Sequence, residues 1–143
     1  MRLLFIHSDH LEFEARDKAG PDDLAETEGV PMEGRMEDCA TVFISVESGD
    51  EESVEGVVAN ALSEITDVTD QLNTRNVVLY PYAHLSDDLA SPDTAKAVMQ
   101  NLEAELTDGY EILRAPFGWY KRFEVACKGH PLSELSRHVA AHR

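Results

Sequence analysis

Residues whose side chains could carry out chemistry gather at three places in this sequence. The first is His7-Ser-Asp-His10, which offers the imidazole, hydroxyl and carboxylate groups of metal sites and of nucleophilic triads. Neighbouring residues of an extended chain point to opposite sides, so these four side chains cannot all face one ligand. The segment therefore predicts a loop that follows a strand and lines a pocket, in preference to a metal site.

The second place is Tyr82-Ala-His84, which follows a short run of apolar residues. Loops that follow buried strands are where α/β folds tend to build ligand sites. His84 could line such a site, or it could be a hydrogen-bonded histidine with a purely structural role. Residue type alone supports both interpretations equally.

The third place is Lys121, which comes directly after Trp119 and Tyr120. An ammonium group between aromatic walls could be directed at an ester, a phosphate or a water molecule. The alternative is a solvated lysine on an edge strand, where it discourages aggregation. Residue type alone favours this alternative.

The sequence lacks the usual catalytic motifs GxSxG, GxxxxGK[ST], GxGxxG and HExxH. Its two cysteines, Cys39 and Cys127, each lie in an apolar run and have neither CxxC nor Cys/His ligand spacing. Such cysteines are predicted to be buried and reduced. Neither a metal nor a cofactor is therefore expected.

Acidic and basic residues are distributed unevenly along the 143 residues, whose net charge is −16. Residues 1–113 contain six Lys or Arg and 26 Asp or Glu, whereas residues 114–143 contain six and two. A cationic, aromatic-rich stretch in an acidic chain predicts an anionic partner, and the end of a nucleic acid is the favoured candidate.

Composition also bears on where the protein works. Only four of the twelve basic residues are lysine, and an acidic surface poor in lysine is typical of a high-salt cytoplasm, where salt screens self-repulsion. An acidic protein of an ordinary cell is the alternative. The apolar run that opens the chain ends at His7, too short for a signal sequence, and no run is long enough to span a membrane. A cytoplasmic location is predicted.

The elements that must position these residues are predicted to form one domain of mixed α/β order. The length allows a single ordinary hydrophobic core. Apolar residues recur every three or four positions from Val54 to Leu72, and again after Pro92, as in amphipathic helices. Strands are predicted over 3–7, 39–46, 76–81, 110–113 and 122–127, helices over 53–72, 92–106 and 131–139, and an irregular connection over 15–38.

Four groups of motifs, in the same order along the chain, resemble the N-terminal editing domain of archaeal threonyl-tRNA synthetases. They are His7-Ser-Asp-His-Leu-Glu-Phe-Glu14; Gly34-Arg-Met-Glu37 with Phe43-Ile-Ser-Val-Glu47; Val78-Leu-Tyr-Pro-Tyr-Ala-His-Leu-Ser86; and Ala115-Pro-Phe-Gly-Trp-Tyr-Lys121 with Cys127-Lys-Gly-His-Pro-Leu-Ser-Glu-Leu-Ser-Arg137. The likeness covers essentially the whole of residues 1–143. It implies a compact α/β domain with a mixed sheet and packed helices, similar to D-aminoacyl-tRNA deacylases, that forms a homodimer.

The resemblance also implies an enzyme that hydrolyses the L-seryl ester of threonine tRNA and releases serine and free tRNA. Serine is threonine without one methyl group, and a binding site can reject a missing methyl by only about 1–3 kcal/mol. A second site that excludes the larger threonine side chain is then needed. The substrate's 2′-hydroxyl and preorganised donors would assist the attacking water, and no side chain has to act as nucleophile.

Residue roles are implied by the same resemblance. Lys121 would hold or polarise the water or the developing oxyanion, with Tyr120 beside it. Glu134 would help to order the water and Lys121, and His84 would lie near the aminoacyl end. The residues that would shape the adenosine and amino-acid pockets are Pro81, Ala83, Ala115, Pro116 and Phe117.

Two features depart from the family pattern. Trp119 stands where a smaller aromatic residue is expected, and the acidic connection at 20–31 is specific to this sequence; both concern the pocket edge and surface charge rather than a catalytic role.

The expected partners are the 3′ end of aminoacylated threonine tRNA, a second copy of the chain and the other domains of a synthetase. A D-aminoacyl-tRNA deacylase and a non-catalytic module that binds tRNA ends are the alternatives.

Overall fold

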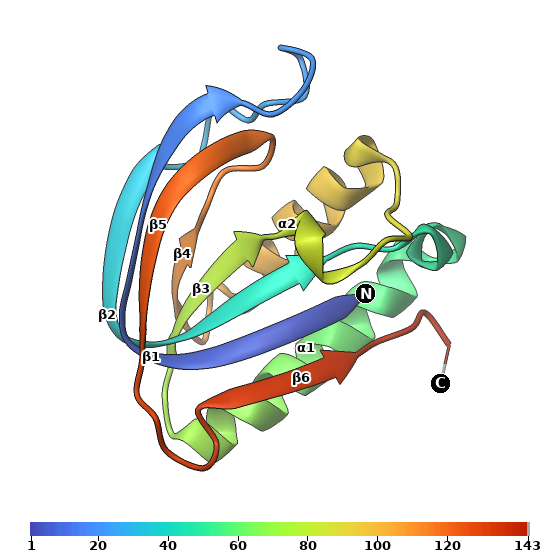
Figure 1. Ribbon diagram of the computed structural model, residues 1–143. Coiled ribbons are helices and arrows are strands. Elements are labelled where there is room, and N and C mark those ends of the chain that lie inside the picture. Colours follow the sequence, from blue (N-terminus) through green and yellow to red (C-terminus); the bar gives the residue numbers. More distant parts are fainter. Residues whose placement is uncertain (143) are drawn as a thin grey trace.

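A curved sheet of six strands runs through the molecule, and two helices cover one of its faces (Figure 1). The computed structural model describes residues 1–142; Arg143, the last residue of the expected domain, lies outside the described residues. The strands are β1 (Arg2–Lys18), β2 (Glu33–Ser45), β3 (Asn76–Pro81), β4 (Glu111–Arg114), β5 (Trp119–Cys127) and β6 (Glu134–His138). The helices are α1 (Val54–Leu72) and α2 (Pro92–Leu106), with short 3-10 turns η1 (Ser48–Glu52) and η2 (Ala83–Leu85). The expected mixed α/β fold is confirmed.

The sheet combines antiparallel and parallel pairing in the order β4-β3-β2-β1-β5. Strand β1 runs antiparallel to β2, β5 and β6, whereas β2, β3 and β4 are parallel to one another. The first part of β1 pairs with β6 and the remainder pairs with β5, so β5 and β6 follow one another along the same edge. β1 therefore connects the two halves of the sheet.

The main core lies between the helices and the sheet. Helix α1 buries Val57, Ala61, Ile65 and Val68, whose spacing of three or four residues places them on one side of the helix. Helix α2 buries Val98, Met99, Leu102 and Leu106 in the same way. These side chains pack against every second residue of the central strands, among them Phe5, Val42, Ile44, Val77 and Leu79.

A second, smaller core lies on the opposite face, where the sheet curls over itself. Its members alternate along β2 and β3 with those of the main core and include Phe13, Phe43 and Tyr80. The curl is tight: a Cβ atom on Gly34 of β2 would lie 2.9 Å from a methyl carbon of Leu113 on β4. The folded-over strand therefore approaches the floor of the sheet closely at this glycine, and a larger residue there would require the Leu113 side chain to shift.

Charged groups hold the start of the chain in place. The α-amino group of Met1 is buried and forms ion pairs with Glu47 at 3.2 Å and Asp50 at 3.0 Å. Glu47 also accepts a hydrogen bond from the hydroxyl of Ser86 and lies 3.0 Å from a ring nitrogen of His138. Burial raises the pKa of Glu47, but these hydrogen bonds and the ammonium group outweigh it and lower the pKa to about 2.

Residues 131–139 do not form the expected helix. Glu134–His138 is strand β6, which pairs with Arg2–Ile6 of β1. Exposed and half-buried residues alternate along it, and Leu135 packs against the main core. Pairing the backbone groups on this side of β1 outweighs the helix propensity of the short segment.

The connection expected at 15–38 is shorter than predicted. β1 continues to Lys18 and β2 begins at Glu33, which leaves 19–32 without strand or helix. The strand ends were missed because charged side chains occupy their exposed positions. The remaining strands and both long helices agree with the prediction to within three residues at each end.

The two cysteines have different environments. Cys39 is buried, as expected, whereas Cys127 at the end of the edge strand β5 is exposed, so that expectation was wrong. Both are free thiols. Within residues 1–142, neither helix combines the length and the apolar character needed to cross a membrane.

Candidate active site

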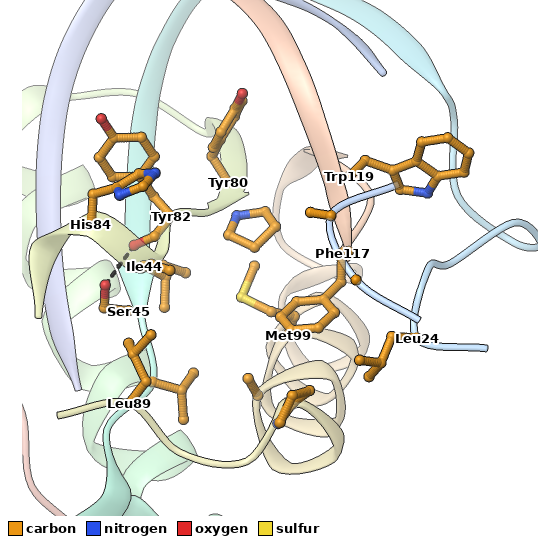
Figure 2. Close-up of a pocket in the computed structure, with 18 of the residues that line it drawn as sticks. Leu24, Ile44, Ser45, Tyr80, Tyr82, His84, Leu89, Met99, Phe117 and Trp119 are labelled. Atoms are coloured by element: carbon orange, nitrogen blue, oxygen red, sulfur yellow. Dashed lines mark hydrogen bonds between the residues drawn. The ribbon is translucent and has the colours of Figure 1, made fainter. Parts of the chain in front are cut away.

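A pocket of about 570 Å³ lies where β2 and β3 end, above one side of α2. Figure 2 shows Tyr80, Tyr82 and His84 on one side of it and Leu24, Phe117 and Trp119 on the other, with Met99 and Leu89 towards the bottom. The carboxyl ends of parallel strands are a common place for ligand sites, because loops diverge there. The position matches the site expected after the strand at 76–81.

Local hydrogen bonds fix the wall that contains His84. Pro81 ends β3, and the backbone N–H of Tyr82 then donates to the carbonyl of Ile44 at 2.8 Å. The hydroxyl of the buried Ser45 donates to the carbonyl of Tyr82, as the dashed line in Figure 2 marks. This wall is thus tied to the end of β2.

Lys121 on β5 brings a basic group into the pocket. Its Nζ donates to the carbonyl of Trp119 at 3.1 Å and lies 5.1 Å from the ring centroid of Tyr80. Burial lowers the pKa of Lys121 to about 8, and the carboxylate of Glu26 opposes part of this shift. A lysine in this state can donate hydrogen bonds to a carbonyl oxygen or a water and can exchange its proton near neutral pH.

Two other predicted residues lie at the edge of the pocket. Tyr120 borders it with a side chain that is 64% exposed. His84 is also exposed, and its ring centroid lies 5.1 Å from that of Tyr82 in an edge-to-face arrangement. Both side chains are placed to meet a ligand as it enters.

The structure brings most of the predicted site residues together. Those that line the pocket are Lys121, Tyr120, His84, Pro81, Ala83 and Phe117. Ala115 and Pro116 are buried just before this lining, and the N–H of Ala115 donates to the carbonyl of Leu79 at 3.0 Å. They therefore position the β4–β5 loop rather than face the pocket.

Glu134 does not reach the pocket of its own chain. It pairs with Ile6 of β1, whereas Lys121 pairs with Ala15, which is about 30 Å further along that strand. The Glu134 carboxylate lies 3.8 Å from the Sγ of Cys127 instead.

The acidic segment at 20–31, which the sequence places at the pocket edge, contributes directly to the wall. Ala19, Gly20 and Leu24 line the pocket, and Glu26 lies buried behind them. Glu26 was missed as a residue of interest. The signal that could have revealed the segment is the apolar pair Leu24-Ala25 within a run of acids.

The cations at 114–137 are largely neutralised by acids from elsewhere in the chain. Arg114 is buried between Glu26 and Glu103, and other ion pairs join Lys128 to Asp9 and Asp38, and Arg137 to Glu64. The stretch is therefore not a continuous anion-binding surface. Of its cations, Lys121 alone lines the pocket among the described residues.

The His7–His10 segment is also different from the prediction. It lies within β1 rather than in a loop, and it does not line this pocket. His7 Nδ1 lies 2.7 Å from His130 Nε2, and burial together with His130 lowers the pKa of His7. Among residues 1–142, no three His, Cys, Asp or Glu side chains gather as a metal site would require.

The fold is similar to two solved structures. A structure described as a c-Myc DNA unwinding element binding protein has a TM-score of 0.65 at 10% identity, with 96% of this chain and 98% of the other covered. One described as a probable eukaryotic D-amino acid tRNA deacylase has a TM-score of 0.53 at 12% identity, with 96% and 97% covered. The expected D-aminoacyl-tRNA deacylase-like fold is confirmed.

Sequence comparison identifies the family. The model of the archaea-specific editing domain of threonyl-tRNA synthetase matches residues 1–139, and the chain belongs to this family. It is 54% identical over 143 residues to a threonine--tRNA ligase of Methanococcus maripaludis, 54% over 140 residues to that of Methanopyrus kandleri and 51% over 142 residues to that of Methanocaldococcus jannaschii. These matches cover 97–100% of the chain but only 22% of each ligase. The expected class, an editing domain of threonyl-tRNA synthetase, is thereby confirmed.

Proposed function

We propose that the pocket binds the 3′ end of threonine tRNA that carries serine and hydrolyses the seryl ester. The observation that carries the proposal is the position of Lys121, whose amine is held by Trp119 inside a pocket of aromatic and apolar walls. A volume of about 570 Å³ suits a terminal adenosine with a small aminoacyl group. Rejection of the extra methyl of threonine is a steric task, which such rigid walls can perform.

The reaction is an ester hydrolysis. A water oxygen attacks the carbonyl carbon, the bond from that carbon to the ribose oxygen breaks, and the released proton ends on the ribose oxygen. Lys121 holds the water or stabilises the developing oxyanion, with Tyr120 beside it, and the substrate's 2′-hydroxyl assists. His84 contacts the aminoacyl end, while Pro81, Ala83 and Phe117 shape the pocket.

We also propose that the protein acts as a homodimer in which Glu134 serves the pocket of the other copy. Support comes from the separation of Glu134 from Lys121 within one chain and from the exposed apolar side chain of Leu132, two residues before Glu134. Mixing Lys121→Met and Glu134→Gln chains tests this. Half of the dimers would be mixed and each would hold one intact pocket, so about a quarter of the wild-type activity should return. If mixing restores no activity, Glu134 does not serve the pocket of the other copy, and any function that it has lies within its own chain.

The reaction is proposed to take place in the cytoplasm, with the other domains of the synthetase holding the rest of the tRNA. Such a division would allow an acidic domain to contact only the terminal nucleotides. It is supported by the net charge of −16 and by the fraction of each ligase that the chain matches.

A deacylation assay with L-seryl-, L-threonyl- and D-seryl-tRNA in parallel tests the function. Preference for the L-seryl ester is expected. Preference for the D-seryl ester would instead identify a D-aminoacyl-tRNA deacylase. Binding without hydrolysis of any ester would identify a module that only binds tRNA ends.

A further inference from the structure

We propose that Glu26 is a positioning residue that joins the 19–26 segment to the β4–β5 loop and thereby sets both the shape of one pocket wall and the charge environment of Lys121. The inference rests on the proposed function for its catalytic consequence only. The wall itself is a property of the fold and can be tested without substrate.

The Glu26 carboxylate is buried and fully engaged. It is 7% exposed and accepts hydrogen bonds from both terminal nitrogens of Arg114, from the side-chain amide of Gln100 at 3.1 Å and from the backbone N–H of Phe117 at 2.8 Å. Arg114 is 3% exposed and also donates to Glu103 at 2.8 Å. One side chain thus connects the acidic segment, α2 and the end of β4.

The backbone of the segment makes a second set of bonds to the same loop. Glu26 N–H donates to the carbonyl of Phe117 at 2.9 Å, and the indole N–H of Trp119 donates to the carbonyl of Glu26 at 2.8 Å. Ala19 N–H donates to the carbonyl of Gly118 at 2.8 Å. The segment has neither strand nor helix of its own, so these bonds hold it in place.

The contact between the two segments leaves no room for a side chain at Gly118. This glycine has a φ of 87°, and a Cβ atom there would lie 2.8 Å from the Cα of Ala25. The joined segments supply neighbouring parts of the pocket wall, and Figure 2 shows Leu24 beside Phe117, across the pocket from Tyr82. A shift of Glu26 would therefore move the surface that meets the ligand.

Glu26 also sets the charge balance around Lys121. None of the described residues that line the pocket is an Asp or a Glu, although the chain contains 28 acids. The other ionisable side chains of the lining are Tyr80, Tyr82, His84 and Tyr120. Burial raises the pKa of Tyr80, so its phenol stays neutral, whereas the Glu26 carboxylate favours the charged form of Lys121. Arg114 is the opposing charge, and Glu26 and Glu103 both neutralise it.

The test compares Glu26→Gln with Glu103→Gln. Both variants remove one carboxylate from Arg114, but only the first disturbs the bonds to Phe117 and the charge near Lys121. In Glu26→Gln we expect faster hydrogen exchange in 19–26 and 117–119. We also expect the titration of Lys121, followed by carbon-13 NMR of its side chain, to move to lower pH than in the wild type, because a carboxylate that favours the ammonium form is lost. We expect kcat/KM for seryl-tRNA to fall roughly tenfold to a hundredfold, as for a misplaced wall. Glu103→Gln should leave exchange in 19–26 and 117–119 at the wild-type rate, and should change the Lys121 titration and kcat/KM less than Glu26→Gln does.

Equal exchange and equal Lys121 titration in the two variants would overturn the proposal. If Glu26→Gln does not fold, Trp119→Phe gives an independent measurement, because it removes the indole donor and leaves the carboxylate. It should speed hydrogen exchange in 19–26, and unchanged exchange would contradict the proposal that this segment is bonded to the β4–β5 loop. If the wild type hydrolyses no aminoacyl-tRNA, the proposed function fails, while exchange and NMR still decide the role of Glu26.

Discussion

The Nζ atom of Lys121 lies 5.1 Å from the centroid of the Tyr80 ring, although their strands, β5 and β3, are separated in the sheet by β2 and β1. The curl of the sheet brings them together. An ammonium over an aromatic face is stabilised by the ring quadrupole, which fixes the amine at the pocket without an acidic neighbour in the lining.

Replacing Lys121 with methionine is expected to slow deacylation of seryl-tRNA by roughly tenfold to a thousandfold, the cost of removing one oxyanion donor. Methionine keeps most of the apolar stem, so the fold should persist. Single-turnover hydrolysis measures the effect, and Lys96→Met, on α2 outside the pocket lining, is the matched control. A wild-type rate in the Lys121 variant would rule out the assignment.

The pH dependence distinguishes the two forms of Lys121. Because its pKa is lowered to about 8, the ammonium form is lost as the pH rises through that value. If the ammonium holds the water or the oxyanion, kcat/KM should fall above about pH 8. A rate that rises through the same range would instead identify the neutral amine as a general base. Rates between pH 6 and pH 10, with Lys121→Met as the reference, give the answer.

Glu47 is expected to make the fold sensitive to acid. Its pKa is lowered to about 2 from a usual value of 4.5, so its stabilising effect is complete above about pH 4.5 and is lost as the pH falls towards 2. The contribution to the free energy of unfolding at neutral pH is at most about 3 kcal/mol. Urea unfolding of Glu47→Gln at pH 7 and pH 3 should show a smaller difference between the two pH values than the wild type.

An exposed carboxylate provides the comparison for that experiment. Glu28→Gln removes one exposed acid from the surface and should reproduce the wild-type difference. If the difference in unfolding free energy between pH 7 and pH 3 is the same in all three proteins, Glu47 is not the group that makes the fold sensitive to acid.

The fold is expected to depend on salt. With a net charge of −16 on 143 residues, self-repulsion acts over about 10 Å at 0.1 M salt but over only about 3 Å at 1 M. Thermal unfolding should therefore move to higher temperature by roughly ten degrees or more between these concentrations. Sucrose at matched osmolality is the control, and indifference to sodium chloride would contradict a high-salt origin.

The parts of the fold that could be predicted are those with a local cause. Helix α2 follows from Pro92 and its apolar spacing, and β3 from a run of apolar residues that ends at Pro81. Strand β6 could not be predicted in this way, because its conformation depends on pairing with β1, more than 120 residues earlier.

The residues of the candidate site differ in the same way: some could be predicted from the local sequence, and others could not. Lys121 and His84 could be found because they adjoin recognisable motifs, and the structure places both at one pocket. Glu26 could not be found, because its structural role depends on its bond to Arg114, which is 88 positions away. Glu134 shows the converse: its motif is recognisable, but a sequence does not say which pocket, or which copy of the chain, a residue serves.

The long curved strands have a consequence for how specificity can change. Because β3 and β5 carry opposite sides of the site but are not neighbours, the width of the site depends on the bend of β1 and β2. That bend includes an irregularity in β1 between Ser8 and His10, close to Asp38, whose φ is 49°. Substitutions at this bend are therefore expected to change the width of the site. Under the proposed function, they could alter which aminoacyl groups fit while every residue that touches those groups stays the same.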